Sequence, residues 1–205
     1  VMEDIRPGVN NYRAINDGEG LSLQQKLVVL NELTKAVAAL HFVGYVSHNL
    51  YPENVYYRLV AEPDGTFRAE VKIIDFQFVR RINEPLEMGL FDGEDGNDDL
   101  WFLDDGKRSE IEIATMPEQK VIAENVAGDI HYLGACFLAL LADGPRREFD
   151  PKTKADIEKL WHGEKTYLAQ LEKVESHVLQ NLIIRMLMFE GRGQYKTLGP
   201  VFFTL

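Results

Sequence analysis

The chain has 205 residues, 45% of them hydrophobic, which is enough for one sizeable core and favours a single compact domain. Its formal net charge of -11 argues against unspecific binding to nucleic acid or to an anionic membrane, because phosphate contacts need clustered Lys and Arg. The same charge leaves room for a protein partner with a basic surface.

The sequence indicates a protein of a reducing, aqueous compartment. The single cysteine, Cys136, lies in an apolar run and cannot form an internal disulfide, so we expect a buried thiol. The longest apolar run, residues 133–142, is about half as long as a bilayer span requires. The first residues also lack the pattern of a signal peptide. We therefore expect a soluble, cytoplasmic protein, with a nuclear location left open.

Residues 21–41 carry two overlapping apolar stripes at helical spacing, which predict a helix that is buried on most sides. Ser22 and Gln25 match a capping box at its start, and Gly44 matches a stop signal beyond its end. Residues 55–60 and 70–74 are rich in β-branched and aromatic side chains and are joined through Pro63-Asp64-Gly65, so they predict a β-hairpin.

The second half of the chain begins with a long loop and then turns helical. Residues 78–108 lack periodicity and collect acidic side chains, which predicts a loop that is either simply solvated or recognises a basic partner. Residues 128–142 are apolar nearly throughout and predict a central core helix. Residues 154–160, 167–174 and 176–189 have amphipathic spacing. The predicted fold is mainly α with one small β-hairpin.

Five short segments follow one another in a characteristic order: VMEDIRPGVNN at 1–11, SHNLYPEN at 47–54, DFQ at 75–77, MPE at 116–118 and GDIHYLG at 128–134. Together they resemble the hinge, catalytic loop, Asp-Phe-Gly segment, Ala-Pro-Glu segment and central helix of the C-terminal lobe of eukaryotic-type protein kinases. The resemblance implies one kinase-like C-lobe over residues 1–205. Its parts would be a hinge at 1–11, a catalytic loop at 47–54, an activation segment with the acidic loop at 75–118, and a core helix at 127–142.

The catalytic loop departs from the kinase pattern at the residues that carry chemistry. In a gap-free alignment on Pro52-Glu53-Asn54, the His-Arg-Asp motif becomes Ser47-His48-Asn49, so an amide takes the place of the catalytic base. In the alternative alignment, His48 is paired with the histidine of the motif, the loop is then one residue short, and the aspartate is the residue that is deleted. The lysine expected after the base is Tyr51. Both alignments imply a pseudokinase-like site without catalytic residues.

Other positions of the nucleotide site are kept or altered. Asn54 and Asp75 match the family's metal-binding positions, so the resemblance leaves binding of ATP and Mg²⁺ open. The alternative is that Asn54 caps its loop and Asp75 bonds to nearby backbone. Glu3, Tyr56 and Ile74 match positions that line the nucleotide pocket, and Tyr56 is bulkier than the usual aliphatic residue.

The resemblance also implies three residues that hold the lobe together. Asp129 would bond to the backbone of the catalytic loop, and Glu118 would form an ion pair with Arg192.

Residues 78–108 contain no Ser, Thr or Tyr, and His48 replaces the arginine that would receive a phosphate, so phosphorylation is not expected to switch this loop.

Three hypotheses follow. The first is a pseudokinase lobe that acts as a protein-binding or allosteric scaffold, with or without residual nucleotide binding. The second is an unconventional active kinase that uses an upper lobe upstream of Val1, because proton transfer is a small part of a loose phosphoryl-transfer transition state. The third is a kinase-derived structural subunit of a larger assembly.

Overall fold

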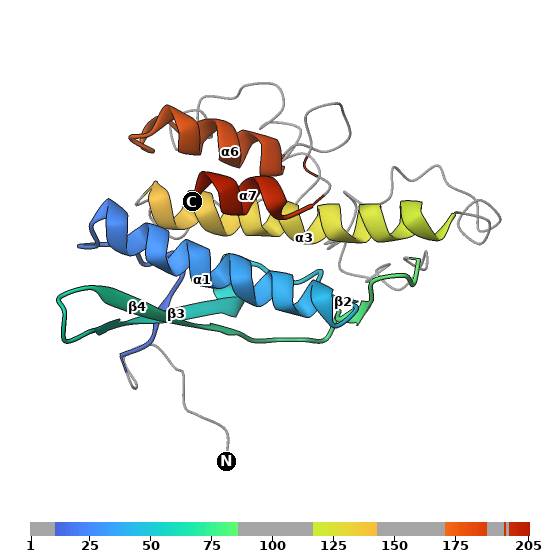
Figure 1. Cartoon of the computed structure of the whole chain (residues 1–205), viewed down its shortest axis with the longest axis horizontal. Helices are drawn as coiled ribbons and strands as arrows, with labels where there is room; N and C mark the ends of the chain where they lie inside the picture. Colours follow the sequence, from blue (N-terminus) through green and yellow to red (C-terminus); the bar gives the residue numbers. More distant parts are fainter. Residues whose placement is uncertain (1–10, 86–116, 143–170, 188–194, 196) are drawn as a thin grey trace, which may run out of the picture.

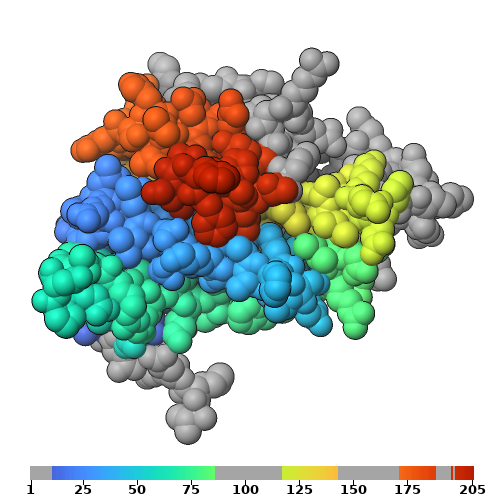
Figure 2. Space-filling model, viewed as in Figure 1, coloured from blue at the N-terminus to red at the C-terminus, as the bar shows by residue number. Residues whose placement is uncertain are grey.

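The computed structural model describes residues 11–85, 117–142, 171–187, 195 and 197–205. The elements are β1 (Arg13–Ala14), α1 (Leu23–Phe42), β2 (Tyr45–Val46), the 3-10 helix η1 (Pro52–Asn54), β3 (Val55–Ala61), β4 (Phe67–Ile73), β5 (Arg80–Arg81), α3 (Glu118–Leu141), α6 (His177–Leu187) and α7 (Gly199–Thr204). They stack in layers: α1 lies between the β3–β4 hairpin and α3, and α6 lies on the far side of α3 (Figure 1). In the space-filling view α7 lies at the surface between α6 and α1 (Figure 2). The structure thus combines helices with small antiparallel sheets; the sequence predicted helices and one hairpin, and strands β1, β2 and β5 were not predicted.

Helix α1 begins and ends at the predicted signals. The hydroxyl of Ser22 accepts from the backbone N–H of Gln25 at 3.2 Å, and the Gln25 side chain accepts from the Ser22 N–H at 2.9 Å. Gly44 has a φ of 88°, which a residue with a Cβ adopts at a cost. One face of α1 is fully buried, but Leu23 is 42% exposed. The prediction of burial on most sides was therefore too broad.

The predicted hairpin is present as β3 and β4. At its turn the Asp64 carboxylate accepts from the backbone N–H and the hydroxyl of Thr66, at 2.9 and 2.6 Å, and Gly65 has a φ of 84°. Tyr57 lies opposite Val71, and Leu59 lies opposite Ala69. These residues belong to the core or contact it. Strand β1, which the sequence did not predict, adds a third strand beside β3.

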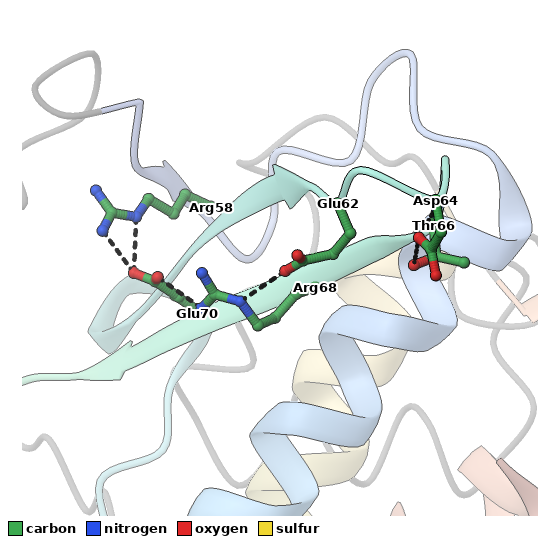
Figure 3. A network of polar contacts seen from close by, with 6 residues as sticks. All are labelled: Arg58, Glu62, Asp64, Thr66, Arg68 and Glu70. Carbon is green, nitrogen blue, oxygen red and sulfur yellow. Dashed lines mark hydrogen bonds and ion pairs between the residues drawn. The ribbon is translucent and has the colours of Figure 1, made fainter.

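The opposite face of the hairpin carries a ladder of charges (Figure 3). Glu70 accepts from Arg58 Nε at 2.7 Å and from Arg68 at 2.7 Å, and Arg68 also donates to Glu62 at 3.0 Å. The hydrogen bond from Arg68, followed by that from Arg58, holds the pKa of Glu70 below its ordinary value. The Arg58 guanidinium lies 4.9 Å from the centre of the Tyr12 ring. Exposed ion pairs add little stability, but these pairs favour one strand register.

Helix α3 forms the centre of the core. It begins at Glu118, well before the predicted starts at residues 127 and 128, because residues 118–120 are polar and exposed and the polar Glu124 and Asn125 separate Val121 from the long apolar run. From Val126 onward nearly every side chain is buried. Helix α3 approaches α6 closely at Gly134, where an added Cβ would lie 2.8 Å from the Cβ of Met186. This glycine therefore permits the contact between the two helices.

Several predictions fall outside the described residues. These are the hinge-like residues 1–10 with Glu3, the acidic segment 86–116, the helix predicted at 154–160, most of that at 167–174, and Arg192. The predicted helix at 176–189 is present as α6 over its described part. None of the described helices is long and apolar enough to cross a bilayer.

Candidate functional site

Asp129 on α3 anchors the loop that resembles the catalytic loop. The backbone N–H groups of Ser47 and His48 donate to its two carboxylate oxygens, at 2.9 and 2.8 Å. The structure thus has the hydrogen bonds predicted for Asp129. The carboxylate is completely buried, and a buried carboxylate requires such donors because it has lost its hydration.

His41 completes this anchor and was not identified from the sequence as a functional or structural residue. It lies in the last turn of α1, and its Nε2 is 2.8 Å from Asp129 Oδ2. The His41 side chain is 11% exposed, so the contact is largely shielded from water. Asp129 therefore joins α1, α3 and the loop at residues 47–48. The two residues are 88 positions apart, so no local pattern could reveal the pair.

His48 is a buried, neutral residue with a left-handed backbone. Its φ is 52° and its side chain is fully buried. The Asn125 amide nitrogen donates to the carbonyls of Ile82 and Glu84, both at 2.9 Å, so the Asn125 oxygen is the group that accepts from His48 Nε2–H at 3.2 Å. Burial lowers the pKa of His48 to about 4. A neutral, buried imidazole cannot replace an arginine as a receptor for phosphate.

Asn49, at the position of the catalytic base, acts as a structural donor. It is 3% exposed, and its Nδ2 donates to the backbone carbonyl of Asp75 at 2.9 Å. Asn54 Nδ2 donates to the carbonyl of Asn49 at 3.1 Å, and the carbonyl of Asn54 accepts from the N–H of Ile74 at 2.9 Å. These bonds connect the loop to the chain that leaves β4. No proton-accepting carboxylate stands at this position.

Asp75 and Asn54 have side-chain oxygens that no described residue engages. The Asp75 side chain is exposed and makes no hydrogen bond or ion pair with the described residues. Asn54 uses its amide nitrogen to brace the loop, which fits the alternative role predicted for it, while its oxygen has no partner in the part of the chain that the structure describes. The alternative prediction, in which the Asp75 carboxylate bonds to nearby backbone groups, is not met among the described residues.

These oxygens fit Mg²⁺ only in combination with a phosphate ligand. Among the described residues no group of three or more His, Cys, Asp or Glu side chains is arranged to hold a metal ion. Mg²⁺ is commonly held by one or two carboxylates together with substrate phosphates and water. One carboxylate and one amide oxygen are compatible with that kind of site and not with a closed protein cage.

The side chains beside the base position pack into the core. The Tyr51 hydroxyl accepts from the Tyr132 hydroxyl at 3.2 Å, and the two rings meet edge to face with centres 4.7 Å apart. The Cys136 thiol is buried, donates to the carbonyl of Leu50 at 3.1 Å, and has its pKa raised by burial. Tyr51 thus packs against α3 where a lysine would supply a charge, and Cys136 is a core thiol as predicted.

The remaining predicted residues lie at the rim of this region. Tyr56 on β3 is half-buried and faces away from α1, as the alternation along the strand requires, and Ile74 is half-buried just beyond β4. Glu118 accepts from the Asn83 side chain at 3.2 Å. Its predicted partner Arg192 lies outside the described residues, so the ion pair stays a prediction.

No protein-family model matches the chain, and no solved structure matches it. The resemblance to protein kinases therefore rests on the order and spacing of the sequence motifs. The function has to be argued from the site itself.

Proposed function

We propose that this chain is a non-catalytic, protein-kinase-like C-terminal lobe that serves as a protein-binding scaffold. The observation that carries the proposal is the hydrogen bond from Asn49 Nδ2 to the carbonyl of Asp75. A catalytic base must accept a proton from the attacking hydroxyl, whereas this side chain is buried and donates to the protein's own backbone.

The surroundings of Asn49 support the same proposal. Tyr51 packs on α3 in the place where a lysine would face the transferred phosphoryl group, and His48 is neutral and buried. The anchoring bonds of Asp129 are nevertheless complete. The residues that hold the loop in shape are present, while Asn49 and Tyr51 replace the base and the lysine that phosphoryl transfer would use.

Residual binding of Mg²⁺ and ATP is part of the proposal. The Asp75 carboxylate and the Asn54 amide oxygen are the groups that would hold the ion. A bound Mg²⁺ would supply positive charge between the phosphate oxygens of the nucleotide. Without a base, such a complex would act as a ligand-dependent switch of the scaffold and not as a substrate complex.

The proposed partner is a protein, and a basic one suits the net charge of -11. Large apolar side chains are available for contact at the end of α1, where Phe42 is 91% exposed and Val43 is 64% exposed. Such residues are frequent in protein interfaces, although single exposed apolar side chains are common on any protein.

The second candidate is an unconventional active kinase with an upper lobe upstream of Val1, and the unengaged carboxylate of Asp75 is the observation that favours it. A phosphotransfer assay on the full-length protein with a generic basic protein substrate separates the two. The scaffold proposal expects no transfer above background. Transfer that disappears in Asp75→Ala would refute it and establish the kinase.

A further inference from the structure

We infer that Asn49 is a positioning residue for Mg²⁺-nucleotide: its amide fixes the Asp75 peptide in a left-handed conformation that presents the carboxylate to solvent. The inference rests on the nucleotide binding included in the proposed function. It assigns to the residue at the base position a role that a catalytic aspartate cannot perform.

The backbone of Asp75 needs such support. Its φ is 58°, a region that residues with a Cβ adopt infrequently and that Asp tolerates better than most. The carbonyl of Asp75 accepts from Asn49 Nδ2, and the N–H of the preceding Ile74 donates to the carbonyl of Asn54. The donor and the acceptor both come from the loop at residues 49–54, so this loop restrains the peptide after the Asp75 Cα directly and the chain before it at the N–H of Ile74.

Asn49 is itself held from the core. Its carbonyl accepts from Asn54, and the preceding residue, His48, is bound through its N–H to Asp129 and through its ring to Asn125. Hydrogen bonds therefore link the buried helix α3, the loop and Asp75 in a continuous series. Asp75, whose side chain is exposed, is the last residue of this series.

The chemistry of the two side chains makes the inference specific. An amide has two N–H donors, whereas an ionised carboxylate only accepts hydrogen bonds. In Asn49→Asp an anionic oxygen would face the Asp75 carbonyl oxygen at the distance of the present 2.9 Å bond. Restoring the residue type of an active kinase would therefore release the segment that carries the metal ligand.

The test is calorimetric titration of the full-length protein with Mn²⁺-ATP, and with ATP in the presence of EDTA. We expect Asn49→Asp to weaken Mn²⁺-ATP binding about tenfold and Asn49→Ala about fivefold, on the scale of one lost hydrogen bond. Metal-free ATP binding should stay within about twofold of wild type, because Asn49 acts only through Asp75. Asn181→Asp, an exposed substitution on α6 with the same change of charge, is the matched control and should bind as wild type does.

Hydrogen exchange of residues 74–79 without nucleotide gives a second readout, and exchange should be faster in both Asn49 variants. If Asn49→Asp does not fold, Asn49→Ala alone carries the comparison. Equal Mn²⁺-ATP affinity in the wild type and the folded variants overturns the inference. Absence of Mn²⁺-ATP binding in the wild type also overturns it, but this result leaves the proposal of a non-catalytic scaffold intact. Phosphotransfer by the wild type overturns the scaffold proposal instead, and the Mn²⁺-ATP comparison still decides the role of Asn49.

Discussion

Two buried histidines, His48 and His131, should make the folded protein sensitive to mild acid. Burial lowers the pKa of each ring from 6.5 to about 4, and the hydrogen bond between His131 Nδ1 and the carbonyl of Leu187, 3.2 Å apart, offsets only part of that effect. Between these two pH values the unfolded chain binds protons that the folded chain does not bind. The free energy of unfolding must therefore fall as the pH falls from 6.5 towards 4, and the contribution is fully present above 6.5.

The size of the effect follows from the same values. The interval from 6.5 to about 4, at about 1.4 kcal/mol per pH unit, corresponds to roughly 3 kcal/mol for each histidine. Together the two groups account for roughly 6 kcal/mol, against about 5–15 kcal/mol for the whole stability of an ordinary domain. A large part of the fold's stability is thus expected to be lost between pH 6.5 and 4.

Urea unfolding at a series of pH values between 4.5 and 7.5 measures this dependence. The wild type should lose up to about 2.7 kcal/mol per pH unit below pH 6, and His131→Leu should reduce that slope by about half, whatever its effect on stability at pH 7.5. His177→Gln, an exposed substitution on α6, is the control and should keep the full slope. A wild-type stability that does not change between pH 6.5 and 4.5 would refute the reasoning.

Three substitutions test the packing and the hydrogen bonds. Gly134→Ala should destabilise the fold by about 1–3 kcal/mol because the new methyl group meets Met186, whereas Gly199→Ala should be tolerated, and equal melting temperatures for the two variants would contradict the close contact of α3 and α6. Ser22→Ala should cost about 1 kcal/mol through loss of the N-cap of α1, measured by urea unfolding, and a cost near zero would mean that the cap is replaced. Asp129→Ala should cost about 3–5 kcal/mol because buried donors lose their acceptor, and a loss as small as that of Ser22→Ala would argue against the anchor.

The parts of the fold that could be predicted are those with local signals. The capping box of α1 and the Asp64-Gly65 turn of the hairpin each lie within a few residues of the elements they define. The start of α3 was placed too late because the polar residues 118–120, 124 and 125 lie outside the continuous apolar run on which the prediction relied. Strand β1 was missed because two residues carry no period, and its strand character depends on the pairing with Tyr56 and Tyr57.

For the candidate site, the sequence identified several of the residues but not the contacts that they make. Motif spacing was sufficient to place Asp129 beside the loop and to predict that Asn49 lacks the function of a base. It could not predict the donor role of Asn49, since the acceptor is a backbone carbonyl 26 positions away. The contributions of His41 and Asn125 depend on contacts 88 and 77 positions away, for which the sequence contains no periodic signal.

The two strained residues of the site show that its shape is held by specific hydrogen bonds. His48 and Asp75 both have left-handed backbones, with φ of 52° and 58°, and neither is a glycine. Such conformations cost roughly 1–3 kcal/mol each and persist where surrounding bonds determine them. Here the bonds come from Asp129, Asn125 and Asn49, and not from any group that transfers a proton. Segments that needed only to connect α1 with β3 and to leave β4 could relax His48 and Asp75, so the maintained strain favours a surface that a ligand or partner reads in this one conformation.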